Sequence, residues 1–226
     1  MAIFAIADLH LSFGADKPMD IFGGWENYVE LIEQNWRKFV SENDHVVIPG
    51  DVSWAMRIEN TLGDFKFIDN LPGTKYILKG NHDYWWTTAS KMQKFFDENN
   101  LRSLKIIHNN AFKFDDYALC GSRGWFVEDE GEHKIILREA GRLETSIVAG
   151  KALGGEPIVF LHYPPVSKNR DVDEIVEVLN RHEIKKCYYG HIHGKGCNYA
   201  FQGSKHGIEF KMVSADYLGF NPYKIV

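Results

Sequence analysis

The sequence has 226 residues, 44% of them hydrophobic, and its 26 basic and 31 acidic residues give a formal net charge of −5. A chain of this length can bury one sizeable core, so we expect a single domain over residues 1–226. A weakly acidic chain lacks the basic surface that binds DNA or RNA without sequence preference, so no large nucleic acid is expected as a partner.

Five short apolar runs, each ending in polar residues, are interpreted as buried strands because glycine and proline bound them. In chain order they are Ala2–Ala7 followed by Asp8-Leu9-His10, His45–Ile48 followed by Pro49-Gly50-Asp51, Lys75–Leu78 followed by Lys79-Gly80-Asn81-His82-Asp83, Ile158–Leu161 followed by His162, and Lys186–Tyr189 followed by Gly190-His191-Ile192-His193-Gly194.

The segments between these runs have helical spacing. Helices are expected over residues 26–40, 55–69, 87–99, 132–152 and 172–182. In the first, one face is expected to carry Tyr28, Leu31, Ile32, Asn35, Trp36 and Phe39. The segment 132–152 is one helix or two, since Gly141 is a weak point. Alternating strands and helices predict an α/β layered fold.

Two stretches interrupt the alternation. Residues 104–120 read as short strands with a hairpin turn at Asp115-Asp116. Residues 197–226 read as a strand-rich tail with a turn at residues 203–207. We therefore expect one sheet extended at both ends by these segments.

The chain is expected in the cytoplasm, without a membrane partner. Its first residues, MAIFAIADLHLSF, lack the basic start and cleavage site of a signal peptide, and no apolar run approaches the roughly 18 residues of a membrane span. Cys120, Cys187 and Cys197 are odd in number and widely spaced, which suggests neither a disulfide framework nor a thiolate zinc site.

The polar residues at the strand ends carry the chemistry, because ligands of α/β folds bind at the carboxyl ends of strands. Carboxylate, amide oxygen and imidazole groups suit a divalent cation. The two polar side chains of D-x-H or H-x-H are two residues apart at a strand end, so they point to the same side. The set is Asp8, His10, Asp51, Asn81, His82, His162, His191 and His193.

The ordered motifs D-x-H, G-D, G-N-H-D, H and G-H-x-H resemble those of the calcineurin-like metallophosphoesterases, including bacterial-type phosphohydrolases, from Asp8 to His193. The resemblance implies a four-layer αββα sandwich of two mixed β-sheets flanked by helices. It also implies two divalent cations, the first held by Asp8, His10 and His193 and the second by Asn81, His162 and His191. Asp51 would bridge the two cations, and His82 would face the substrate.

The implied reaction is hydrolysis of a phosphomonoester or phosphodiester by a metal-activated hydroxide, between ions roughly 3.5–4 Å apart. Asp51 and His82 are the expected catalytic residues, with His82 as general acid or transition-state stabiliser. We expect Mn²⁺ as the activating ion, with Fe and Zn²⁺ as alternatives. The substrate is expected to be a small phosphate ester whose identity the sequence leaves open, together with the oligomeric state.

Other residues have competing interpretations. Asn81 and Arg123 are expected substrate contacts, since an arginine in a glycine-rich loop can clamp a phosphate; alternatively, Arg123 caps a helix or pairs with Glu128. The loop 13–25 is a pocket wall or a lid. Trp54 stands where the family often has aspartate, in G-D-x-x-D, which leaves open what orients His82. Two other functions remain, a metal-dependent nuclease and a non-catalytic protein-binding scaffold.

Overall fold

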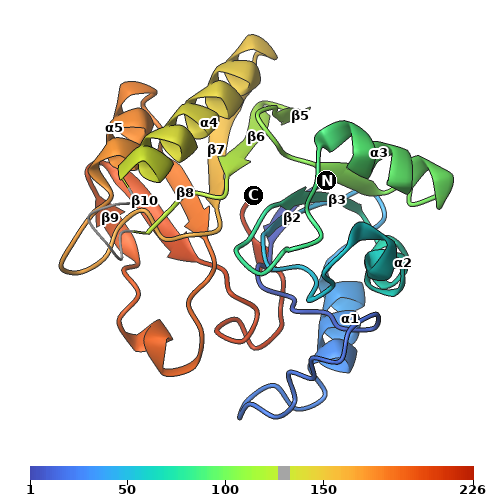
Figure 1. Cartoon of the computed structure of the whole chain (residues 1–226). Helices are drawn as coiled ribbons and strands as arrows, with labels where there is room; N and C mark the ends of the chain where they lie inside the picture. The colour runs from blue at the N-terminus through green and yellow to red at the C-terminus, as the bar shows by residue number, and fades with distance from the viewer. Residues whose placement is uncertain (127–132) are drawn as a thin grey trace.

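The computed structural model describes residues 1–126 and 133–226 and contains two packed β-sheets (Figure 1). The first sheet has the strand order β11-β1-β2-β3-β4. Strands β1 to β4 run parallel, and β11 pairs antiparallel with β1 at the edge. These strands are β1 (Ile3–Ala5), β2 (His45–Pro49), β3 (Thr74–Leu78), β4 (Leu104–Ile106) and β11 (Tyr223–Lys224).

The second sheet has the strand order β5-β6-β7-β8-β10-β9. Its four central strands are parallel, and β5 and β9 pair antiparallel at the two edges. The strands are β5 (Phe112–Phe114), β6 (Tyr117–Ser122), β7 (Glu156–Leu161), β8 (Lys186–Tyr189), β9 (Gly203–Lys205) and β10 (Ile208–Met212).

Helices cover the outer face of each sheet (Figure 1). The helices α1 (Tyr28–Phe39), α2 (Leu62–Asp69) and α3 (Ala89–Glu98) lie on the first sheet, and α4 (His133–Ala152) and α5 (Asp173–Arg181) lie on the second. Two short 3₁₀ helices, η1 (Ile58–Thr61) and η3 (Gly194–Asn198), complete the described elements. The predicted four-layer αββα sandwich of two mixed sheets is confirmed.

Three apolar clusters correspond to the three contacts between these four layers. Trp36 and Phe65 lie in the cluster under α1 and α2, and Leu143 lies in the cluster under α4. Val47 and Phe160, from β2 and β7, belong to the cluster between the sheets. Because both faces of each central strand are buried, these strands have continuous apolar sequences rather than alternating ones.

The helix predictions need two corrections, and one open alternative is decided. In α1 the buried face consists of Tyr28, Ile32 and Trp36, whereas Leu31 and Phe39 are 38% and 45% exposed, because the stripe that contacts the sheet is narrower than predicted. The helix expected over residues 55–69 begins only at Leu62, after η1. The segment 132–152 forms one helix from His133 onward, and residue 132 lies outside the described residues.

Of the two predicted turns, one is confirmed. β5 and β6 form an antiparallel hairpin, with Asp115 in the left-handed region at φ 47°. The turn expected over residues 203–207 is shorter than predicted, since Gly203–Lys205 is strand β9 and the turn is His206-Gly207. Both turn residues have positive φ, 54° and 75°, as a two-residue hairpin of this kind requires.

No helix among the described residues combines the length and apolarity needed to cross a membrane. The parallel order of the central strands brings the carboxyl ends of β1, β2 and β3 to one edge of their sheet, and those of β6, β7 and β8 to one edge of theirs. An isolated parallel bridge between Ala7 and Ser214 links the segments that follow β1 and β10. The polar residues of the candidate site follow these strands.

Candidate metal centre

The residues expected as metal ligands all lie in the turns that follow parallel strands. Four of them, none a glycine, have backbones in the left-handed region: Asp8 at φ 62°, His10 at 46°, Asp51 at 51° and His191 at 72°. Such conformations are uncommon for residues with a Cβ, and clusters of them occur where function fixes the backbone. The backbone therefore marks this edge as a functional site independently of its side chains.

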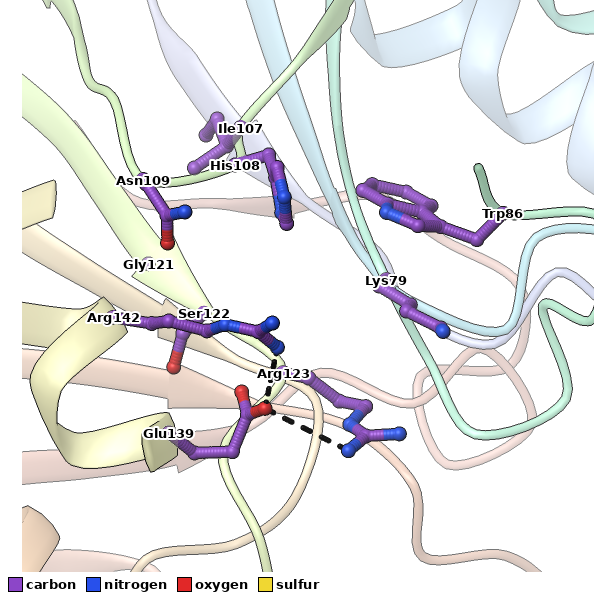
Figure 2. Close-up of a pocket in the computed structure, with 10 residues that line it drawn as sticks. All are labelled: Lys79, Trp86, Ile107, His108, Asn109, Gly121, Ser122, Arg123, Glu139 and Arg142. Atoms are coloured by element: carbon purple, nitrogen blue, oxygen red, sulfur yellow. Dashed lines mark hydrogen bonds and ion pairs between the residues drawn. The ribbon is translucent and has the colours of Figure 1, made fainter. Parts of the chain in front are cut away.

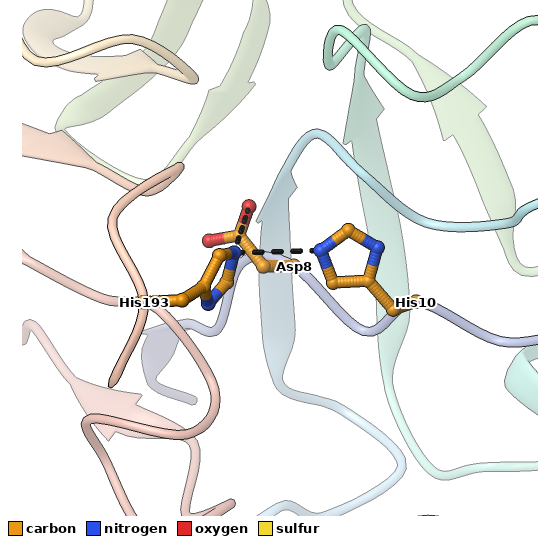
Figure 3. Close-up of side chains that lie close together, drawn as sticks. All are labelled: Asp8, His10 and His193. Carbon is orange, nitrogen blue, oxygen red and sulfur yellow. Dashed lines mark hydrogen bonds and ion pairs between the residues drawn. The ribbon is translucent and has the colours of Figure 1, made fainter. Parts of the chain in front are cut away.

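Asp8, His10 and His193 form a first group able to hold a cation (Figure 3). The Nε2 atoms of His10 and His193 lie 3.4 Å apart, and His193 Nε2 lies 3.7 Å from Asp8 Oδ1. Figure 3 shows the two imidazole rings facing each other beside the carboxylate. Imidazole nitrogens and a carboxylate oxygen converging in this way make up the donor set of a borderline divalent cation.

Asp51, His162 and His191 form a second such group. The side chain of Asn81 joins it, with Oδ1 2.6 Å from His162 Nε2 and 2.9 Å from His191 Nδ1. His162 is fully buried, and its Nδ1 lies 3.0 Å from the carbonyl oxygen of Pro49. That contact fixes the ring so that Nε2 faces the group, as a second contact on a metal-binding histidine commonly does.

Asp51 lies between the two groups. Its Oδ2 is 3.8 Å from His10 Nε2 in the first group and 3.5 Å from His162 Nε2 in the second. Its other oxygen, Oδ1, accepts a hydrogen bond from the backbone N–H of His82 at 2.8 Å. One carboxylate thus contacts both histidine sets and the loop that carries His82.

Two of the histidines have the protonation state that metal binding requires. Burial lowers the pKa of His10 and of His191 to about 3, so both rings are neutral at pH 7 with a nitrogen lone pair free to bind. Burial and the adjacent Asp8 carboxylate raise the pKa of Asp51 to about 8. Burial lowers the pKa of His193, but the negative charges of Asp8 and Asp216 outweigh burial and raise this pKa to about 10. Two buried carboxylates this close favour a positive charge beside them.

His82 belongs to neither group. Its ring lies 4.4 Å from the Trp54 ring and 5.8 Å from that of His10, centroid to centroid. Its Nδ1 is buried and has no hydrogen-bond partner within the part of the chain that the structure describes. The ring borders a cavity of about 440 Å³ that His10, Trp54 and His193 also line. His82 therefore faces this cavity rather than either group of candidate ligands.

Trp54 occupies the place of the aspartate often found in relatives, and it packs on a predicted ligand. Its ring stacks on His10 with centroids 4.9 Å apart and planes at 23°. The loop 13–25 supplies the facing wall of the same cavity, with Trp25 only 4% exposed and 5.7 Å from both His10 and His193. The buried Trp25 therefore favours the pocket wall over the lid as the role of this loop.

Two carboxylates that support the site were not among the predicted ligands. Asp216 Oδ1 lies 3.0 Å from His193 Nδ1, and its Oδ2 accepts the Gly194 N–H at 2.8 Å. Asp83, fully buried, accepts hydrogen bonds from the backbone N–H of Asp51 and Gly80 at 2.9 and 2.7 Å. Asp216 lies four residues after the end of β10, and no motif in the sequence marks it as a site residue.

Arg123 follows β6 at the same sheet edge, but its side chain points into another cluster (Figure 2). Its guanidinium lies 3.7 Å from Glu139 Oε1 and 4.5 Å from the Trp125 ring centroid. Figure 2 shows the buried Glu139 carboxylate between Arg123 and Arg142, the latter at 2.7 Å. The alternative partner Glu128 lies outside the described residues. The carbonyl oxygen of Arg123 accepts the N–H of His162, which ties it to the second group.

The αββα sandwich and the paired histidine–carboxylate groups define a metal-dependent hydrolase. The sequence matches the family model of calcineurin-like phosphoesterases over residues 1–195, and the chain belongs to that family. It is therefore a phosphoric ester hydrolase of a family that uses divalent metals.

The comparison with curated proteins finds no match. Among solved structures, the chain is similar to the phosphopantetheinyl hydrolase from Mycobacterium tuberculosis, with 13% identity, a TM-score of 0.56 and coverage of 100% of this chain and 95% of that one. It is also similar to a protein of unknown function from Aquifex aeolicus, with 15% identity, a TM-score of 0.53 and coverage of 99% and 95%. At these identities the likeness supports the fold alone.

Proposed function

We propose that this protein hydrolyses a small phosphate ester with two divalent cations bound at the candidate metal centre. The observation that carries the proposal is the position of Asp51, whose Oδ2 lies within 3.8 Å of an imidazole nitrogen of each group. A carboxylate in that position fits the role of a bridging ligand in a two-metal site.

The donor atoms divide into two sets around this bridge. Asp8, His10 and His193 would hold one cation, and Asn81, His162 and His191 would hold the other, with Asp51 shared. This mixture of oxygen and imidazole donors suits Mn²⁺, Fe and Zn²⁺, and we propose Mn²⁺ as the activating ion. The neutral state of His10 and His191 supports the assignment, because metal ligation requires an unprotonated nitrogen.

Bound cations would acidify a water molecule and neutralise the charge that develops on the phosphoryl oxygens. The protein's own residues supply orientation and a proton. Tyr28 donates a hydrogen bond to the carbonyl oxygen of His10 at 3.0 Å, and Asp216 holds the ring of His193. His82 faces the 440 Å³ cavity and would give a proton to the leaving oxygen, a contribution of about 10²–10⁴-fold to the rate.

We propose Asn81 and Arg123 as substrate contacts. Asn81 lies within the second group, so a phosphate held there would be within reach of its amide. Arg123 is engaged with Glu139, so a phosphate would compete with that carboxylate for the guanidinium. We also propose the cytoplasm as the location, because the three cysteines are unpaired and Cys120 and Cys187 are buried as thiols.

The test is hydrolysis of p-nitrophenyl phosphate and bis-p-nitrophenyl phosphate by the purified protein, with Mn²⁺ and with chelator. Turnover that requires metal is expected, with loss in Asp51→Asn and a 10²-fold or greater decrease in His82→Ala. Asp97→Asn, an exposed carboxylate on α3, is the matched control and should retain wild-type turnover. A folded, metal-free protein with no turnover would favour the scaffold, and cleavage of plasmid or single-stranded DNA at rates above those of the small esters would favour the nuclease.

A further inference from the structure

Two apolar cavities adjoin the candidate metal centre, one on each side of its histidines. The first, of about 440 Å³, is lined by Met19, Phe22, Trp25 and Trp54 and borders His10, His82 and His193. The second, of about 290 Å³, is lined by Pro164, Val166, Ile192, Ala200 and Phe201 and borders His191. Both volumes are near or within the roughly 300–1,000 Å³ of small-molecule sites.

The turn Gly190-His191-Ile192-His193-Gly194 separates the two cavities. His191 and Ile192 face the second cavity, while His193 and Gly194 face the first. A phosphorus atom held between the two metal groups would therefore have one cavity on each side, only a turn apart. The two cavities are built mainly by loops of different sheets, the first by residues 19–25 and Trp54, the second by residues 164–167 and 192–201.

Both cavities are mainly apolar apart from the histidines of the candidate metal centre. The described residues that line them include no aspartate, glutamate, lysine or arginine. The cationic side chains of Lys79, Arg123 and Arg142 line a separate cavity of about 20 Å³ and do not line either of these two. Both cavities are thus suited to uncharged apolar or aromatic groups.

We propose that the substrate is a phosphodiester with an uncharged apolar or aromatic group on each side of phosphorus, which rests on the proposed function. A monoester has one organic group and would leave one cavity empty, whereas a diester fills both. His82 borders only the first cavity, so the leaving group occupies that one, and the retained group occupies the second.

In the hydrolysis, the oxygen of one water molecule bonds to phosphorus as the bond from phosphorus to the leaving oxygen breaks. One water proton is released to the site, the leaving oxygen takes a proton from His82, and the imidazole is reprotonated from solvent. The products are an alcohol or phenol from the first cavity and a phosphomonoester that retains the group in the second.

The experiment varies the retained group while the leaving group and net charge stay constant. It compares phenyl p-nitrophenyl phosphate with methyl p-nitrophenyl phosphate, both diesters that release p-nitrophenol, and adds p-nitrophenyl phosphate as the monoester. For the wild type, kcat/KM is expected to be at least tenfold higher for the phenyl than for the methyl diester, and higher for the phenyl diester than for the monoester.

Three variants locate the preference. Ala200→Trp fills the second cavity and Phe201→Ala widens it, so each should reduce the phenyl-to-methyl ratio toward one. Phe22→Ala, in the first cavity, should raise KM for all three substrates and leave the ratio unchanged. Ala152→Trp, on the exposed end of α4 that precedes β7 at the opposite sheet edge, is the matched control.

Wild-type hydrolysis of the monoester in preference to both diesters would overturn this inference and leave the proposed function standing. A phenyl preference that survives in both Ala200→Trp and Phe201→Ala would also overturn it. Absence of metal-dependent turnover with all three esters would instead refute the proposed function. If Ala200→Trp loses monoester turnover through misfolding, Phe201→Ala decides.

Discussion

Asp83 offers the sharpest test of how the fold holds the metal centre. The fully buried carboxylate accepts five hydrogen bonds. Oδ2 accepts the backbone N–H of Asp51 and Gly80 at 2.9 and 2.7 Å. Oδ1 accepts those of Val52 and Ser53 at 2.9 and 3.3 Å and the Trp85 indole N–H at 2.9 Å. This one side chain ties the turn after β2 to the turn after β3, so we predict that Asp83→Asn destabilises the protein and weakens metal binding.

The magnitude follows from the bonds that an amide cannot make. Whichever way the introduced amide is oriented, its NH₂ group faces at least two N–H donors, and losing two bonds to a charged acceptor removes about 3–6 kcal/mol. Burial and the nearby Asp51 raise the pKa of Asp83 from 3.8 to about 6, so removing the charge returns about 3 kcal/mol. The amide hydrogens left without acceptors add a cost of about 1–3 kcal/mol. The expected net loss of stability is about 1–6 kcal/mol.

The assay is urea unfolding at pH 7, followed by circular dichroism, with chelator and with excess Mn²⁺, together with elemental analysis of bound metal. Asp83→Asn should have a lower unfolding midpoint in chelator and bind less metal, because the Asp51 turn loses its anchor. Asp97→Asn is the matched control, since its exposed carboxylate accepts only the Gln93 amide within the described chain. That control should lie within about 0.5 kcal/mol of wild type. An Asp83→Asn protein within 1 kcal/mol of wild type and with full metal content would refute this reasoning.

Three further predictions test the site and the core. A Cβ on Gly190 would lie 2.5 Å from Asp8 Oδ2, so Gly190→Ala should lose bound metal and activity. The control is Gly141→Ala on α4, where an added Cβ meets open space. That variant should stabilise the protein by about 1 kcal/mol in urea unfolding. Mn²⁺ at 100 times its Kd should stabilise the folded wild type by about 2.7 kcal/mol, which corresponds to a rise in Tm of about 5–10 °C. The same rise in Asp51→Asn would contradict the proposed bridging role of Asp51. Burial lowers the pKa of Lys75 from 10.5 to about 8. Between pH 8 and 10.5 the unfolded chain therefore binds up to one more proton than the folded chain. The free energy of unfolding should rise with pH over this range by up to about 1.4 kcal/mol per pH unit, relative to Lys75→Met. Equal pH slopes for the wild type and Lys75→Met would show that this lysine keeps its ordinary pKa.

The positions of the proposed ligands could be predicted because parallel strands impose them. Each motif directly follows an apolar run, and the runs β1, β2 and β3 pair in parallel, so Asp8, Asp51 and Asn81 arrive at one edge. The same argument places His162 after β7 and His191 after β8. The period of the apolar residues and the turn glycines placed these residues at one sheet edge, and the resemblance to metallophosphoesterase motifs supplied their proposed roles.

The supporting contacts could not be predicted, because they depend on tertiary neighbours. Nothing near Asp216 in the sequence indicates that it meets His193, 23 residues away. Asp83 binds the turn after β2 across 30 to 32 residues, which the motif that contains it does not indicate. The stacking of Trp54 on His10 likewise pairs residues from different loops.

The exposed face of α1 shows the same limit in the core. The residues Tyr28, Ile32 and Trp36 recur every four positions and form the buried stripe. Leu31 and Phe39 fit the helical period almost as well, but they lie at the margin of the sheet contact and remain exposed. Periodicity identifies the helix, and the width of the surface it meets decides which of its apolar residues are buried.

Hydrogen bonds between the strained turns hold the proposed metal ligands in position. Left-handed backbone at Asp8, His10, Asp51 and His191 costs roughly 1–2 kcal/mol per residue. The same turns are cross-linked, since the Asp8 N–H donates to Gly50 O at 3.0 Å, the His10 N–H to Asp51 O at 2.9 Å and the His191 N–H to Asp8 Oδ2 at 2.9 Å. Each bond joins turns that follow different strands, so no turn can relax without breaking a hydrogen bond to another turn. These hydrogen bonds therefore hold the proposed ligands in place, and chelation should lower stability while the secondary structure is retained.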